Sequence, residues 1–159
     1  CREWEKAADP ARQAGIRVVH PRIGVVFSKK GGALPKMSLP LRMGVGGVVG
    51  SGQQYLPWLS LQDLLSALQF LLQAPLEGPV NVCAPTPVTN RDLTQVMASV
   101  LHRPAFFPLP ALMVRLIFGE MGEEILLGGN RVIPEKLLNS GFVFLNASLK
   151  EFLEKELNS

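Results

Sequence analysis

The sequence predicts an α/β fold. Short apolar segments rich in β-branched residues, such as residues 16–27 and 80–84, alternate with longer segments whose leucines recur at helical spacing, such as residues 61–72. This alternation is typical of a sheet covered by helices rather than of an all-helical or all-β protein. A chain of 159 residues that is 47% hydrophobic and 18% charged can bury one sizeable core, so we expect a folded unit.

The composition argues against several classes of function. The net charge of +3 comes from 16 basic and 13 acidic side chains that are scattered along the chain, so we expect no nucleic-acid groove. Cys1 and Cys83 belong to no Cys-x-x-Cys pattern, which favours an intracellular, reducing compartment and gives no support to a zinc site. Polar residues interrupt the longest apolar stretch, residues 56–72, so we expect no membrane span.

The first part of the chain predicts a helix followed by a buried strand. The helix runs through Ala8 and should end near Pro10. Residues 16–27 show little polar alternation, which predicts a strand buried on both faces. Pro21 cannot donate to a neighbouring strand and Gly24 has no side chain to pack, so the strand should end or bend near Pro21 and open into a loop. Ligands bind beyond the carboxyl ends of strands in open α/β sheets, which makes this strand end the first candidate site. Because the chain opens directly on the helix without a Met, we expect it to begin in mid-domain.

A glycine-punctuated excursion follows in residues 29–52, with a short apolar helix predicted near residues 34–43. Its last part, residues 44–52, could be taken for a phosphate-binding loop. It lacks the Gly-Lys-Ser/Thr ending of a P-loop, and the residues after it do not open a helix that could hold a pyrophosphate. We therefore favour a flexible loop that covers a pocket.

Capping residues mark the starts of later helices. In each case a hydroxyl can accept from a backbone N–H three residues on, where a carboxylate stands: Ser60 with Asp63, Thr89 with Asp92, and Ser148 with Glu151. Residues 80–84 predict a compact strand between the first two of these helices. Residues 106–109 predict a further short strand, and Pro110 a helix start for residues 111–118.

Single polar and aromatic residues leave alternatives open. Arg22, at the end of a buried strand, needs an anionic or carbonyl partner: either a salt bridge to an acidic group outside this chain, or a cofactor phosphate or substrate anion. His20 and His102 have no partner at triad or metal-ligand spacing, which favours packing or capping. Trp58 is read as core rather than pocket wall. Asp63 in a first turn stabilises its helix by about 0.3–1 kcal/mol through the dipole.

Two groups of motifs, taken in order, resemble a known family. Arg22-Ile23-Gly24-Val25-Val26, Gly50-Ser51-Gly52-Gln53-Gln54, Pro57-Trp58-Leu59-Ser60 and Gly78-Pro79-Val80-Asn81 are similar to the second half of the extended short-chain dehydrogenase/reductases. Phe107-Pro108-Leu109-Pro110, Phe118-Gly119-Glu120-Met121, Arg131-Val132-Ile133-Pro134 and Gly141-Phe142-Val143-Phe144 are more specific. They resemble the C-terminal region of the atypical epimerase-family branch.

The resemblance implies the C-terminal part of an NAD(P)-binding Rossmann-type fold with a small α/β substrate domain. Residues 1–34 and 56–84 would hold the last elements of the Rossmann-type domain, and residues 35–55 and 85–159 the substrate domain. The nucleotide fingerprint and the usual catalytic Tyr and Lys would precede Cys1, so the catalytic residues stay unknown. The strands would need neighbours outside the chain, and we expect exposed strand edges and aggregation of the isolated chain.

The resemblance also implies a site, a cofactor and a function. The nicotinamide side of the cofactor site would be lined by Pro21, Arg22, Ile23 and Gly24, and the substrate cleft by Met37, Leu41 and Trp58. The cofactor would be NADP(H), with NAD(H) as the alternative and no metal. The protein would be an NADP(H)-dependent oxidoreductase or a nucleotide-sugar epimerase-like enzyme; the alternative is a non-catalytic nucleotide-binding regulator or partner-binding protein. Its partners would be a small-molecule substrate and the N-terminal half of the same protein, and a homo-oligomer stays open.

Overall fold

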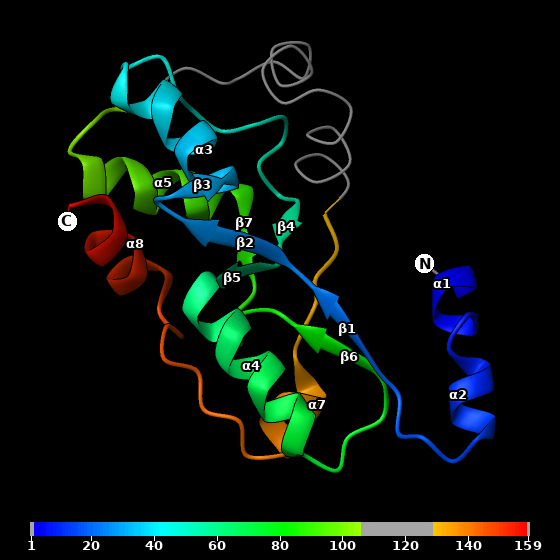
Figure 1. Cartoon of the computed structure of the whole chain (residues 1–159). Helices are drawn as coiled ribbons and strands as arrows, with labels where there is room; N and C mark the ends of the chain where they lie inside the picture. Colours follow the sequence, from blue (N-terminus) through cyan, green and yellow to red (C-terminus); the bar gives the residue numbers. More distant parts are fainter. Residues whose placement is uncertain (1, 106–128, 159) are drawn as a thin grey trace.

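The computed structural model describes residues 2–105 and 129–158, which form small sheets with helices packed around them (Figure 1). The helices are α1 (Arg2–Lys6), α2 (Asp9–Gln13), α3 (Ala33–Arg42), α4 (Leu61–Gln73), α5 (Asn90–Leu101), α7 (Glu135–Asn139) and α8 (Leu149–Leu157). The strands are β1 (Val19–Ile23), β2 (Val25–Ser28), β3 (Gly31–Gly32), β4 (Tyr55–Leu56), β5 (Trp58–Ser60), β6 (Gly78–Val82) and β7 (Val88–Thr89). The predicted α/β class is confirmed. The strand predicted at residues 106–109 and the helix at 111–118 lie outside the described residues.

The strands pair in three groups. β1 lies parallel to β6, β2 lies parallel to β5 and antiparallel to β3, and β4 lies antiparallel to β7. Gly24 stands between β1 and β2, where the chain passes from the first group to the second. A Cβ at this position would lie 2.1 Å from the carbonyl oxygen of Pro57, so the close approach of the two segments requires glycine.

The strand β1 differs from the prediction in two ways. It does not end or bend near Pro21 but continues through it to Ile23, because the missing N–H of Pro21 falls on the edge that does not face β6. The Val18 carbonyl accepts a hydrogen bond from the Gly78 N–H, and the Gly24 N–H donates to the Val82 carbonyl. The backbone groups of the even-numbered residues therefore bond to β6, and those of the odd-numbered residues face away from it.

β1 is also not buried on both faces. Pro21, Arg22 and Ile23 are exposed, because in the described part of the chain β1 pairs with β6 alone. The predicted exposed strand edge is therefore confirmed, and it presents the N–H of Ile23 and the carbonyl of Pro21 to one side of the molecule.

The predicted leucine helix is α4, but its leucines do not all face the core. The side chains it buries include Asp63, Ala67 and Leu71. Three leucines of this helix stay exposed, namely Leu61 (40%), Leu65 (60%) and Leu72 (78%). With the partly buried Leu68, these exposed leucines follow each other at intervals of four, three and four residues, so they share one face of the helix, which we call the α4 leucine face.

Most predicted helix boundaries agree with the structure. Thr89 and Asp92 form a complete capping box at α5, and the Ser148 hydroxyl accepts from the Glu151 N–H at α8. His102 ends α5 in the left-handed conformation, with φ of 52°. Pro10, by contrast, does not end the first helix. It lies in the first turn of the separate helix α2, where its missing N–H costs no intrahelical bond.

Two hydrophobic clusters form the core. In the first, Trp58 is 1% exposed and its ring centroid lies 6.0 Å from that of Phe27 and 5.2 Å from that of Phe152. The second lies between α4, β5, β6 and the segment around α7, and includes Leu137 and Phe142. Both clusters draw on segments far apart in sequence, and the domain boundaries given above stay a prediction.

Side chains hold both ends of α4. At its start, the fully buried Asp63 carboxylate accepts from the Ser60 hydroxyl at 2.7 Å and from the N–H groups of Leu145 and Asn146 at 2.7 and 3.0 Å. At its end, the Arg17 guanidinium donates to three backbone carbonyls, those of Leu71, Leu72 and Leu76, at 2.8–3.0 Å. Asp63 thus does more than complement the helix dipole, because it ties residues 145–146 to the start of α4.

Replacing Asp63 with Ala should destabilise the protein by roughly 3 kcal/mol or more, because each buried N–H left without an acceptor costs about 1–3 kcal/mol. Asp92→Ala is the matched control. Asp92 occupies the same position in the first turn of α5 but is exposed, so its loss should cost only about 1 kcal/mol. Urea unfolding of both variants measures the difference. Equal losses would show that the bonds to residues 145–146 contribute little.

Candidate functional site

A groove of about 860 Å³ lies beside the open edge of β1. Its walls come from α1, from β1, from Pro57 before β5, from the end of β6 and from residues 131–133. In Figure 1, α1 and α2 stand apart from the rest of the molecule on one side of β1. The groove therefore occupies the side of the sheet that the described chain leaves uncovered.

The four residues predicted to bind the cofactor all line this groove. Pro21, Arg22, Ile23 and Gly24 form one wall, and Pro57 and Cys83 lie beside them where β1 and β6 reach their carboxyl ends. The free carbonyl of Pro21 and N–H of Ile23 could bond a planar amide such as that of nicotinamide. The groove volume is within the range of small-molecule sites. The size of the groove and its polar edge therefore suit the nicotinamide half of the cofactor that the resemblance implies.

Arg22 forms a two-pronged salt bridge across one end of the groove. Its Nε lies 2.8 Å from Oε1 of Glu5 and its Nη2 lies 3.0 Å from Oε2. The hydrogen bonds from this guanidinium hold the pKa of Glu5 below its ordinary value of 4.5, and Glu5 raises the pKa of Arg22. Of the two readings of Arg22, the structure thus shows an ion pair, with an acidic group in this chain rather than outside it.

Residues 131–133 form the opposite wall, which the sequence indicated only as a family motif. The Asn81 amide donates to the Ile133 carbonyl at 3.2 Å, and the Cys83 thiol lies 3.7 Å from the Val132 carbonyl. The Arg131 guanidinium lies 5.9 Å from the centre of the Tyr55 ring, a cation–π contact. Within the described ranges Arg131 has no carboxylate partner, so its charge is available at the carboxyl end of the sheet. Sequence spacing could not find this wall, because Asn81 and Ile133 are 52 residues apart.

Burial raises the pKa of the Cys83 thiol to about 11. The thiol is therefore protonated at neutral pH, and it cannot act as a nucleophile there. Among the described residues, no group of three or more His, Cys, Asp or Glu side chains could hold a metal ion.

The three residues predicted to line the substrate cleft all belong to the first hydrophobic cluster or pack against it, but they do not line one common cavity. Met37 and Leu41 line a small cavity between α3 and α5, and Trp58 lies in the first hydrophobic cluster, as its core reading predicted. None of the three is among the residues that line the groove. Their part in substrate binding stays a prediction.

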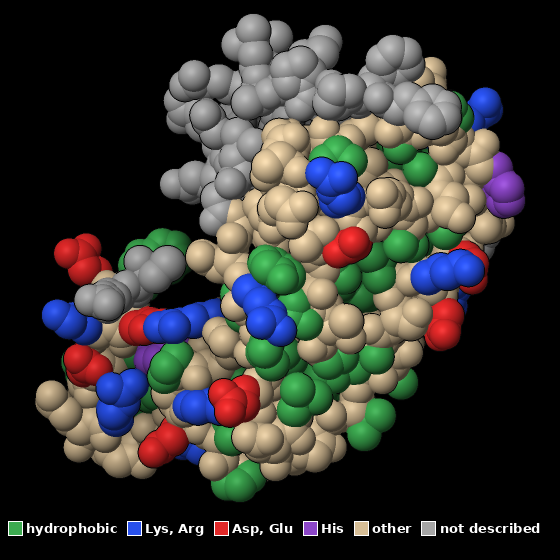
Figure 2. Space-filling model, turned by 180° about the vertical axis from the view of Figure 1, so that it is seen from behind, with side chains coloured by type: hydrophobic (Ala, Val, Ile, Leu, Met, Phe, Trp, Pro, Cys, Tyr) green, Lys and Arg blue, Asp and Glu red, His purple; other side chains and the backbone are tan. Residues whose placement is uncertain are grey.

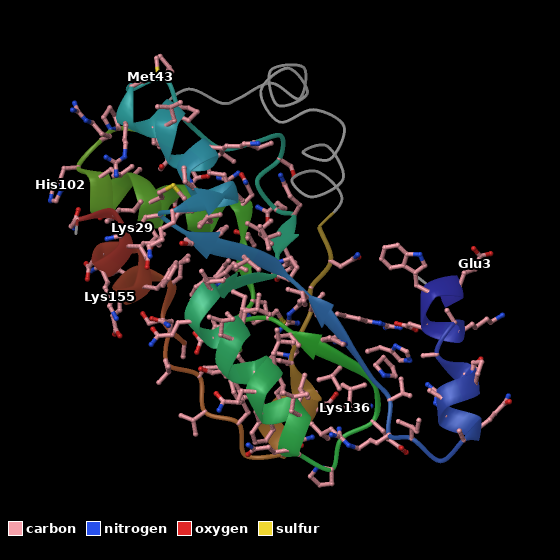
Figure 3. The ribbon with its side chains drawn as sticks, viewed as in Figure 1. Glu3, Lys29, Met43, His102, Lys136 and Lys155 are labelled. Carbon is pink, nitrogen blue, oxygen red and sulfur yellow. The ribbon has the colours of Figure 1, made fainter. Side chains whose placement is uncertain are left out.

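The two histidines differ, because His102 caps a helix as expected whereas His20 lines the groove. His20 contacts the Arg12 guanidinium at 3.2 Å on the surface, and His102 ends α5 at the outer end of that helix (Figure 3). On the face drawn in Figure 2, acidic and basic side chains are intermixed rather than gathered into one basic patch. None of the helices in the described ranges has the length and apolar character that a membrane crossing requires.

Alkylation tests the state of Cys83. In a Cys1→Ser background, iodoacetamide should modify Cys83 at pH 8 at least about 100-fold more slowly in the folded protein than in urea, because only the thiolate reacts and burial raises the pKa. The folded rate should keep rising about tenfold per pH unit toward pH 11. A folded rate close to the unfolded one would contradict the high pKa.

Comparison with known protein families gives one match. Residues 109–156 match the family described as a domain of unknown function (DUF1731). The first twenty of these residues lie outside the described ranges, and the rest comprise the groove wall at residues 131–133, α7 and α8.

Curated relatives match nearly the whole chain. It is 45% identical over 154 residues to the epimerase family protein Mb2239 of Mycobacterium bovis, which covers 96% of this chain and 51% of that protein. It is 39% identical over 160 residues to the human epimerase family protein SDR39U1, which covers 95% of this chain and 53% of that protein. The chain spans about half the length of the curated relatives it matches.

Solved structures show the same relationship. The crystal structure of human SDR39U1 (isoform 2) with NADPH superimposes with a TM-score of 0.83 at 37% identity, covering 91% of this chain and 49% of that one. A nucleoside-diphosphate sugar epimerase from Corynebacterium glutamicum gives 0.79 at 30% identity, covering 99% and 30%. A Thermus thermophilus UDP-glucose 4-epimerase complex with NAD gives 0.69 at 15% identity over 99% and 50%, which shows the fold alone. The fold is thus the C-terminal part of an NAD(P)-binding Rossmann-type fold.

Proposed function

Because the chain corresponds to the C-terminal half of an epimerase family protein, we propose that it supplies the substrate-side half of an NADP(H)-dependent oxidoreductase or nucleotide-sugar epimerase-like enzyme. The observation that carries the proposal is the groove at the carboxyl end of β1, lined by residues 21–24. Support for the cofactor comes from the human relative, which was crystallised with NADPH.

The described residues suit binding and orientation more than proton transfer. A bound nicotinamide cofactor would supply the hydride chemistry. The open edge of β1 would position its amide through the Pro21 carbonyl and the Ile23 N–H. Arg131, with no carboxylate partner in the described ranges, would attract the anionic part of a substrate such as a nucleotide sugar. Proton-transfer groups would come from the N-terminal half.

The alternative, a non-catalytic nucleotide-binding regulator, is distinguished by the N-terminal half rather than by the described groove residues. Among the described groove residues, the group whose pKa shifts far is the Cys83 thiol, and that shift keeps it protonated and inert. Catalysis would then depend wholly on the N-terminal half. If the full-length protein carried neither a Tyr nor a Lys aimed at the groove, the regulator would become the better proposal.

We also propose that the N-terminal half covers the open edge of β1 and the α4 leucine face. The two surfaces are continuous, because a hollow lined by Val19, Pro21, Leu68 and Leu72 joins the strand to the helix. A further parallel strand would pair with the first part of that edge, before the Pro21 carbonyl and the Ile23 N–H that we assign to the cofactor, and a neighbouring helix would bury the leucines.

Cofactor binding separates the two readings of Arg22. In the full-length protein, Arg22→Ala should weaken NADPH binding at least about tenfold if the guanidinium contacts the cofactor, since a lost charged hydrogen bond costs about 1.5–3 kcal/mol. Glu5→Gln is the matched control, because it breaks the same salt bridge but keeps the cation. It should leave the affinity unchanged or tighter in a fluorescence titration. Equal weakening by both variants would assign Arg22 a structural role, and no NADPH binding by the wild type would overturn the cofactor proposal.

A charge on the α4 leucine face tests how the halves pack. In the full-length protein, Leu65→Lys should lower the free energy of unfolding by several kcal/mol, because a covered lysine loses its hydration. Val143→Lys is the control, since Val143 is 76% exposed and belongs to the loop between α7 and α8 rather than to the α4 leucine face. Its effect should stay within about 0.5 kcal/mol. A Leu65→Lys variant as stable as the control would show that the face is open to solvent.

A further inference from the structure

A small cavity lies between α3, α5 and the glycine-rich loop that joins α3 to β4. Its volume is about 30 Å³. Apolar side chains make most of its wall, with Met37, Pro40 and Leu41 from α3, Val49 from the loop, and Leu93 and Met97 from α5. Polar groups also face the cavity, however, so its wall is not wholly apolar.

Asn90, the first residue of α5, brings an amide to this wall. It is 1% exposed, and its Oδ1 accepts from the Val49 N–H at 2.9 Å. This bond fixes which end of the amide is oxygen, because a backbone N–H can only be accepted by Oδ1. The Nδ2 group, which carries two donors, has no hydrogen-bond partner among the described residues.

Two peptide groups of the loop also lack hydrogen-bond partners among the described residues. Gly46 and Gly47 are buried and line the same cavity, and their peptide groups make no hydrogen bond with any other described residue. Buried peptide groups are nearly always paired, with protein or with ordered water. The loop and α3 are in close contact at Gly46, where a Cβ would lie 2.7 Å from the Leu41 backbone nitrogen.

We propose that this cavity is an internal hydration site, in which one ordered water, or at most two, accepts from Asn90 Nδ2 and bonds the peptide groups of Gly46 and Gly47. The size of the cavity identifies water as the ligand. A water needs about 10–15 Å³ and two to four polar partners, whereas a cavity that takes benzene measures about 150 Å³. The cavity at 30 Å³ is therefore too small for an organic group and large enough for water.

The proposed hydration site gives residues 44–52 a structural role, in place of the phosphate binding that their sequence does not support. Val49 is held at both of its polar groups, by Asn90 Oδ1 and by Gln54 Nε2, which donates to the Val49 carbonyl at 2.8 Å. The Arg91 guanidinium donates to the Ser51 carbonyl at 3.1 Å. Water would hold residues 46 and 47 in the same way, so that the whole loop is fastened over the cavity rather than freely flexible.

A high-resolution crystal structure of the full-length protein tests the site. We expect a water within about 2.7–3.2 Å of Asn90 Nδ2. In solution, the Asn90 side-chain amide protons should show a nuclear Overhauser effect to a long-lived water. Nδ2 bonded to a protein group, or a cavity without ordered density and without that effect, would overturn the proposal.

Two substitutions of Asn90 separate hydration from packing. Asn90→Asp keeps an acceptor for the Val49 N–H and can still bind water, which would turn its hydrogens toward the carboxylate, and the helix start favours the negative charge. It should retain the water and nearly the wild-type melting temperature. Asn90→Leu should lose the water from the density and melt several degrees lower. The melting difference also includes the Val49 N–H bond that only the Leu variant loses, so the density decides: water loss in the Asp variant, or water kept in the Leu variant, would contradict the site.

Discussion

The buried carboxylate of Asp63 connects parts of the chain that are far apart in sequence. It lies at the start of α4 and accepts from the N–H groups of Leu145 and Asn146, more than 80 residues later. Because Asn146 also donates to the Ser60 hydroxyl at 3.0 Å, the bonds form a closed set in which each partner orients another. Arg17 holds the opposite end of α4 by its carbonyls. An anion at the start of a helix and a cation at its end both interact favourably with the helix dipole. The charges of Asp63 and Arg17 therefore stabilise α4 and also hold it in place.

The path of β1 defines the groove. The chain leaves β1 at Gly24, where β5 approaches so closely that only glycine fits, and it enters β2 in a different sheet. In the part of the chain that the structure describes, this step leaves one edge of β1 without a strand while β6 covers the other. The polar edge, the carboxyl ends of two parallel strands and the cation of Arg131 consequently meet at one place. The site therefore follows from strand pairing, with side chains added at its rim.

Sequence reasoning succeeded where the determining contacts are local. The capping residues of α4, α5 and α8 bond within three positions of themselves, so their patterns predict the helix starts. It was wrong for Pro21, because the edge a strand residue faces depends on register with β6, almost sixty residues away. It also could not find residues 131–133 as a wall, since no local pattern places them against Asn81. For Arg22 the sequence predicted an anionic or carbonyl partner, and the structure shows the anionic partner Glu5. The identity of this partner was not predictable, because it depends on where the first helix lies.

In the proposed function, the site would be divided between two halves of the protein, and the described groups of the groove would supply the binding half. The described residues offer hydrogen-bonding backbone, one ion pair, one cation and a protonated thiol. These groups can hold a ligand and set its orientation, but the protonated thiol cannot begin a proton transfer at neutral pH. Orientation alone is a large part of catalysis when it is precise, and it depends on rigid walls. Here the β1–β6 ladder and the ion pair of Arg22 with Glu5 order the groups that would bind the ligand, while in the proposed function the reacting groups would come from the N-terminal half.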